Sequence, residues 1–229
     1  MKRFARLALL LPCLIAAYLG LAAAWAGYTY DSLAAALPPP HPGTLSPRQS
    51  AILLAVEDPD FYTHAGISFA AGQGVTTLSS AVARDFYLVE GQSGSVMRRF
   101  YAGVQRCCKA IDLGRDAMAL VLDARMPKDR QLDYYAGHVY MGTQAGVQVR
   151  GLALAALLYA GKPLAALDEH EFVRLVAMIK APNQYHPQRQ PAALAERVAR
   201  IEALLAGRCR PTGWSDTLYE TCKSSQGNV

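Results

Sequence analysis

The chain has 229 residues, and its 23 Lys and Arg against 18 Asp and Glu give a net charge of +5. With 52% hydrophobic and 18% charged residues it is too apolar for a disordered protein, and its length allows one or two domains. Part of the basic excess lies in Lys2, Arg3 and Arg6, and no later stripe of basic residues with interleaved aromatics follows. Nucleic-acid binding is therefore not predicted.

An uncharged segment runs from Leu7 to Ala26, which is about the length of a membrane-spanning helix. The three basic residues before it predict that the N-terminus stays in the cytoplasm and that the rest of the chain lies outside. A cleaved signal peptide is the alternative, because Ala24-Trp25-Ala26 has a small-x-small form. The segment is long for a signal peptide, so we expect an uncleaved anchor over residues 1–30.

The proline-rich residues 31–45 predict a tether, and helical periodicity follows it. Ser46 and Pro47 predict the start of a helix that ends where Asp58 meets Pro59. Further helices are expected from Thr76, around 117–125, from Lys128, over 152–160, from Asp168 (which forms a capping box with Glu171) and from Pro191 to Gly207. No alternating strand pattern is present, so we predict one all-α domain over 46–207 and a tail over 208–229.

The cysteines give one structural expectation. Cys209 and Cys222 bracket a short loop, and outside the cytoplasm we expect them to pair. Cys107 and Cys108 are adjacent, an arrangement more typical of small buried residues than of a redox site. The absence of CxxC and of Cys/His spacing argues against a cysteine-bound metal.

The segment Glu57–Gly66 concentrates ionisable side chains at a predicted helix end. An apolar helix face and the negative end of the helix dipole would both raise the pKa of Glu57, which suits a carboxyl that transfers protons. The alternative is a solvated helix end with a structural histidine.

This segment, EDPDFYTHAG, resembles the first motif of the peptidoglycan glycosyltransferases of family 51, EDxxFxxHxG, at all five fixed positions. Residues 128–142, 150–163 and 175–189 are similar to three later segments of that family, KDxILExYLNxVYxG, RGxxxAAxxYFGKP and LxxMxKxPxxYNPxR. The resemblance covers roughly 44–206. It implies a lysozyme-like helical domain with an N-terminal transmembrane helix, on the outer face of the cytoplasmic membrane.

The resemblance also implies a function and a site. The family polymerises lipid II, with a lipid-linked glycan chain as donor, and the carboxylate matching Glu57 deprotonates the acceptor. The implied partners are these lipids, the membrane and other cell-wall synthesis proteins. No cofactor is certain, and a divalent cation is left open. No SxxK or KTG motif follows, so a monofunctional enzyme is expected. The implied catalytic residues are Glu57, Asp58, His64 and Asp112, and the implied substrate-binding residues are Phe61, Gly74, Thr76, Thr77, Arg84, Lys109, Arg115 and Lys180.

The second motif of the family, GxSTxTQQLxKN, is altered in residues 74–85. Thr76 and Thr77 retain hydroxyls, Arg84 retains a positive charge, and Ser80 and Ala81 replace the paired glutamines. The glycine-rich turn before a helix suits a diphosphate through free backbone N–H groups, although an ordinary N-cap is the alternative. Four cations then follow, which either steer a diphosphate or anionic lipids or form a solvated face: Arg98, Arg99, Arg106 and Lys109.

The third motif, RKxxE, is degenerate. Counting back from Lys128 without a gap places Arg115 at the glutamate position, whereas a shifted register makes Asp112 the second carboxylate. Asp112 and Asp116 would share one face of a continuous helix. A peptidoglycan glycosyltransferase is therefore the leading hypothesis. A catalytically weak or inactive binder of lipid II or of cell-wall synthesis proteins is the second, and a murein-cleaving lysozyme-like enzyme is the third.

Overall fold

The computed structural model describes residues 2–38, 44–74, 76–89, 99 and 112–223, and these divide into two compact units. Unit 1 contains residues 1–39, 65–67 and 79–127, and unit 2 contains residues 40–64, 68–78 and 128–229. The segment 46–207, expected as one domain, contributes to both.

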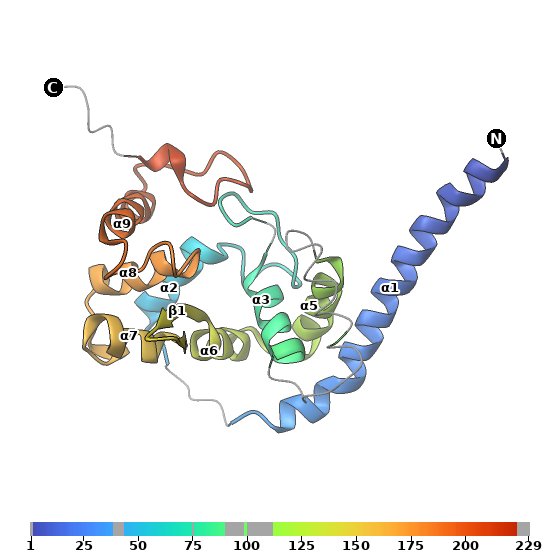
Figure 1. Cartoon of the computed structure of the whole chain (residues 1–229), viewed down its shortest axis with the longest axis horizontal. Coiled ribbons are helices and arrows are strands. Elements are labelled where there is room, and N and C mark those ends of the chain that lie inside the picture. The colour runs from blue at the N-terminus through green and yellow to red at the C-terminus, as the bar shows by residue number, and fades with distance from the viewer. Residues whose placement is uncertain (1, 39–43, 75, 90–98, 100–111, 224–229) are drawn as a thin grey trace. The chain divides into compact units, whose positions relative to one another are not determined.

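Unit 1 begins with helix α1, Lys2–Ala35, which continues through the first residues of the predicted tether (Figure 1). Within it, Leu11–Ala35 is long and apolar enough to cross a membrane. The other elements of the unit are α3 (Leu78–Arg84, whose first residue belongs to unit 2), the π-helix η1 (Asp85–Val89) and α5 (Leu113–Arg125). Helix α3 begins just after the predicted Thr76-Thr77 start.

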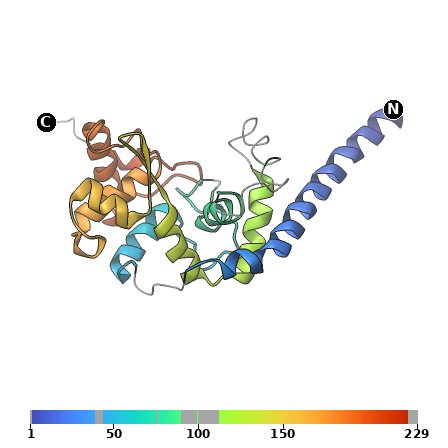
Figure 2. The same ribbon diagram turned by 60° about the horizontal axis from the view of Figure 1, so that its bottom comes forward.

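The C-terminal half of α1 packs along α5, and the views in Figures 1 and 2 agree on this. Ala22 and Ala26 in this half of α1 are at most 1% exposed, and such small side chains allow helices to approach closely. The rings of Tyr30 and Phe86 lie 5.8 Å apart, and the Tyr30 hydroxyl donates to the Arg125 carbonyl oxygen at 3.0 Å. This end of α1 is therefore part of the folded unit.

Unit 2 is built around α8, Glu169–Ile179, whose apolar face packs on α2 (Pro47–Glu57) and α9 (Pro191–Leu205) (Figure 1). The capping box of Asp168 with Glu171 is present as predicted, and Ser46 forms a second one with Gln49. Helices α6 (Lys128–His138) and α7 (Leu152–Ala160) and the short 3-10 helices η2 (Leu164–Ala166) and η3 (Glu220–Cys222) complete the helical elements.

A β-hairpin corrects the expectation that the domain has no strands. Strand β1, Tyr140–Gln144, pairs antiparallel with β2, Val147–Arg150. The connection is the two-residue turn Ala145-Gly146, in which both residues have positive φ, as the tightest hairpin turns require. The strands are too short for an alternating pattern to stand out in the sequence, and Ala is an unusual first residue for such a turn.

The predicted disulfide between Cys209 and Cys222 is confirmed. It closes residues 208–223, here called the C-terminal loop, which includes η3 and lies against α9. Cys107 and Cys108 lie outside the described residues, as do Arg98, Arg106 and Lys109.

Candidate functional site

Glu57 is the last residue of α2, one turn after the buried Leu53 on the same face of the helix. Its side chain is half-buried, and desolvation by the surrounding protein raises its pKa. The positive charges of Arg197 and Lys180 act in the opposite direction, and the neighbouring Asp58 adds to the rise. The direction predicted from the sequence is confirmed, and a carboxyl with a raised pKa is a stronger base once ionised.

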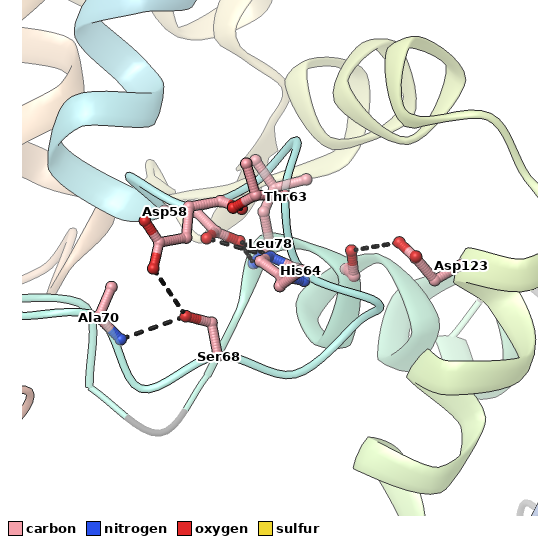
Figure 3. A network of polar contacts seen from close by, with 9 residues as sticks. Asp58, Thr63, His64, Ser68, Ala70, Leu78 and Asp123 are labelled. Atoms are coloured by element: carbon pink, nitrogen blue, oxygen red, sulfur yellow. Dashed lines mark hydrogen bonds and ion pairs between the residues drawn. The ribbon is translucent and has the colours of Figure 1, made fainter.

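Asp58 is fully buried and holds the backbone that follows Glu57 (Figure 3). Its carboxylate accepts a hydrogen bond from the Leu78 backbone N–H at 2.7 Å, and the His64 ring nitrogen Nε2 lies 3.1 and 3.2 Å from its two oxygens. Burial raises the pKa of Asp58, while the hydrogen bonds from the Leu78 amide and His64 lower it and so oppose part of the rise. The carboxylate thus joins the first motif to the start of α3.

Phe61 is 1% exposed and forms part of the core of unit 2. Its ring packs edge-on against Tyr62, and the Lys128 ammonium lies 4.7 Å from the ring centre. The Tyr62 hydroxyl donates to the Asp129 carboxylate at 2.8 Å, and desolvation followed by this bond raises the pKa of Tyr62 to about 12. The structure therefore places Phe61 among core contacts, and a direct substrate contact would require it to leave them.

The glycine-rich turn is held by the C-terminal loop. The Gly72 and Gly74 N–H groups donate to the carbonyl oxygens of Gly213 and Trp214 at 2.9 and 2.6 Å. Both glycines have positive φ, and a Cβ on Gly72 would lie 2.8 Å from the Tyr219 ring. Gly74, predicted to bind the diphosphate, therefore has no free amide for it, because a distant part of the chain already binds that N–H group.

Three further predicted residues lie beside this turn or close to Glu57. Thr77 is buried, and Thr76, one position earlier, is half-buried. Lys180 follows the last turn of α8, and burial lowers its pKa while the nearby Glu57 raises it. The structure thus brings Lys180 and Glu57 into one electrostatic cluster.

The predicted site residues of unit 1 interact with neighbours in the sequence. Asp112 caps α5 by accepting from the Arg115 backbone N–H at 3.0 Å. The Arg115 guanidinium, only 10% exposed, pairs with the Asp116 carboxylate at 3.2 Å. Arg84 pairs with Asp85 at 3.0 Å and remains 42% exposed. The predicted helical phase of Asp112 and Asp116 is altered by the cap, since α5 begins only after Asp112.

Two residues that the sequence analysis did not single out complete the surroundings of Glu57. Arg197 on α9 is 2% exposed, and its guanidinium lies 5.3 and 5.7 Å from the ring centres of Tyr185 and Tyr219. The Tyr219 hydroxyl donates to the carbonyl oxygen of Val56, the residue before Glu57, at 2.6 Å. Desolvation and the Glu57 charge raise the pKa of Tyr219. No local pattern marks either residue, because both act through contacts between distant segments.

The part of the chain that the structure describes holds no cluster of three His, Cys, Asp or Glu side chains suited to a metal ion.

The helical fold and the half-buried glutamate at a helix end agree with the expected lysozyme-like transglycosylase domain, and comparison with known proteins shows the family. The family model described as Transglycosylase matches residues 40–205, more than half of the chain. The chain belongs to the transglycosylase family.

Several named relatives are similar to this chain. Penicillin-binding protein 1B of Escherichia coli is 33% identical over 167 residues, 67% of this chain and 18% of the relative. The protein of the same name from Vibrio cholerae is 32% identical over 160 residues, 63% of this chain and 18% of the relative. The biosynthetic peptidoglycan transglycosylase of Rhodospirillum centenum is 28% identical over 175 residues, 71% of this chain and 68% of the relative. The chain thus spans under a fifth of the length of the first two.

Proposed function

We propose that this chain is a peptidoglycan glycosyltransferase that polymerises lipid II into glycan strands. The observation that carries the proposal is Glu57, a half-buried carboxyl with a raised pKa that ends α2 within a complete first family motif. Membership of the transglycosylase family and the names of the relatives support the substrate class.

In the proposed reaction, ionised Glu57 accepts the proton of the acceptor sugar hydroxyl as that oxygen attacks the donor's anomeric carbon, and the lipid diphosphate leaves. General-base catalysis of this kind contributes roughly 10²–10⁴-fold. Lys180 and Arg197 favour the ionised form of Glu57, which is the form that accepts a proton. We assign Asp58 and His64 to positioning, because they bind each other and the start of α3.

We assign binding of the anionic diphosphate to cationic side chains instead of the amides of the glycine turn. Lys180, which is exposed and whose charge acts on Glu57, is the candidate in unit 2. In unit 1, Arg84 and Arg115 are paired with the carboxylates of Asp85 and Asp116. Lys109 stays a sequence-based proposal, since it lies outside the described residues.

We further propose that α1 anchors the protein in the cytoplasmic membrane by a single pass, with both units outside the cytoplasm. The apolar span Leu11–Ala35 supports the anchor, and the basic start supports the orientation. The burial of Ala22 and Ala26 against α5 favours a retained helix, because cleavage after Ala26 would remove part of this packing.

A second function is favoured by one observation. The Asp112 carboxylate caps α5 and Arg115 is paired, so the residues that stand in for the third motif are already engaged. This arrangement supports a protein that binds lipid II without polymerising it.

Both functions are tested by incubating the full chain in detergent micelles with labelled lipid II and measuring polymer and bound lipid. We expect polymer from the wild type and a loss of at least about 10²-fold in Glu57→Gln. Glu169→Gln is the matched control, because Glu169 is exposed and pairs only at the surface with Arg48. Bound lipid II without polymer in the wild type would favour the binder, and equal rates in wild type and Glu57→Gln would exclude Glu57 as the base.

A further inference from the structure

The C-terminal loop contacts the backbone at two places in the sequence, directly before Glu57 and in the glycine-rich turn that follows the motif 57–66. The Tyr219 hydroxyl binds the carbonyl of Val56, directly before Glu57, and the Gly213 and Trp214 carbonyls bind the glycine turn. The disulfide between Cys209 and Cys222 closes the loop that carries all three of these groups. The C-terminal loop thus connects the end of α2, which carries Glu57, to the glycine-rich turn.

Arg197 is the residue through which this loop reaches the charge on Glu57. Its Nε donates to the Ala177 carbonyl at 3.0 Å, and its Nη1 donates to the Thr217 carbonyl, in the loop, at 3.2 Å. The Tyr185 and Tyr219 rings lie close to the guanidinium. These partners fix the guanidinium but are all uncharged, so they do not neutralise it.

The charge of Arg197 therefore acts on the ionisable group nearby. The charged and titratable groups that face Glu57 are Asp58 beside it, Lys180 after α8, Arg197 on α9 and Tyr219 in the loop. Of these, Arg197 is a permanent cation in a buried position, where solvent screens its charge least. A buried cation of this kind keeps a neighbouring carboxylate ionised.

We propose that Arg197 is a positioning residue that keeps Glu57 ionised as the base, and that the disulfide-closed loop 208–223 holds Arg197 in the place where it does so. The inference rests on the proposed function for its consequence in catalysis. The effect of Arg197 on the ionisation of Glu57 is measurable without any reaction.

The first test is the pH dependence of lipid II polymerisation by the full chain. Arg197→Gln removes the cation, so Glu57 becomes protonated at higher pH and the acid limb of the rate profile moves upward. An opposite charge nearby shifts a carboxyl pKa by about 1–3 units, so we expect a movement of about one pH unit and about a tenfold loss of rate below that limb. The rate should recover at high pH, and Arg197→Lys should restore most of the profile.

Arg200→Gln is the matched control. Arg200 also lies on α9, is buried and donates to the loop at the Leu218 carbonyl, but its charge is paired with Glu196 and Glu220. We expect this variant to leave the acid limb in place. A uniform loss of rate in Arg197→Gln at every pH, or an equal shift in Arg200→Gln, would overturn the proposal.

The second test reads Glu57 directly and separates this inference from the proposed function. The side-chain carboxyl carbons are labelled with ¹³C, the Glu57 signal is assigned by its absence in Glu57→Gln, and the signal is titrated by NMR. The titration should move to higher pH in Arg197→Gln and, by less, in the double variant Cys209→Ser with Cys222→Ser. An unmoved Glu57 titration in Arg197→Gln overturns the inference even if the wild type polymerises lipid II. A shifted titration supports it even if no polymer forms.

Discussion

Two buried arginines, Arg197 in unit 2 and Arg115 in unit 1, show how the two parts of the chain use the same side chain differently. Arg197 donates to neutral backbone carbonyls and lies between aromatic rings. Arg115 donates to the carboxylate of Asp116, the next residue. The charge of Arg197 therefore acts on Glu57, whereas the charge of Arg115 is neutralised by the adjacent Asp116. A buried cation reaches a distant group only when its own donors are satisfied by uncharged atoms.

The largest stability effect is expected where the charge is neutralised locally. Asp116→Asn should destabilise unit 1 by about 1–3 kcal/mol, because it leaves the buried Arg115 without its charged partner. Thermal unfolding of the full chain measures this. The double variant Asp116→Asn with Arg115→Met removes both groups and should recover part of the loss. An unchanged unfolding temperature in Asp116→Asn would mean that the ion pair contributes no stability, and it would contradict the difference drawn between Arg115 and Arg197.

A smaller effect is expected from the cap beside that pair. Asp112→Ala removes the side chain that accepts from the Arg115 backbone N–H and should cost about 1 kcal/mol. Asp112→Ser keeps a capping oxygen and should cost less. The same two variants decide a functional question in the lipid II assay. If Asp112→Ser loses polymerisation while unfolding like the wild type, Asp112 is a second carboxylate and not only a cap.

The smallest effect concerns Glu57 itself and depends on pH. Because the folded-state pKa of Glu57 is raised above its ordinary value, the ionised carboxylate costs stability at neutral pH, and this cost disappears at pH values below the ordinary pKa. Glu57→Gln should therefore unfold at a higher temperature than the wild type at pH 7, and the difference should vanish toward pH 4. The control Glu169→Gln should show the reverse sign, since the pKa of Glu169 is lowered by Arg48. A pH-independent difference for Glu57→Gln would contradict the raised pKa.

Local chemistry made much of the fold predictable from the sequence. The capping boxes at Ser46 and Asp168 fixed two helix starts, and Gly161, with its positive φ, ends α7 where the sequence indicates. The disulfide was predicted from a short cysteine spacing together with the expected location outside the cytoplasm. These signals lie within a few residues of the feature that they specify, so a single sequence carries them.

The parts that escaped prediction depend on contacts between distant segments. The glycine turn has the composition of an anion-binding turn, and only the approach of Gly213 and Trp214 shows that two of its amides are occupied. Arg197 reads as an ordinary helix position, since its role requires Tyr219 and Glu57 to meet it in space. The hairpin escaped because its strands are short and lie within a family segment that reads as a helix. The raised pKa of Glu57 was predictable because a helix end and an apolar face are local properties.

The continuity of α1 restricts the motion of unit 1. Residues 31–45 were expected to be a tether, but α1 stays helical to Ala35 and its C-terminal half is packed on α5. A helix rises about 1.5 Å per residue, so Leu11–Ala35 measures about 37 Å, slightly more than the roughly 30 Å hydrocarbon core of a bilayer. Because the half of α1 that packs on α5 lies within this span, a membrane-spanning α1 would place part of unit 1 at the depth of the outer leaflet. For the proposed lipid-linked substrates, this would place unit 1 in the leaflet that holds them.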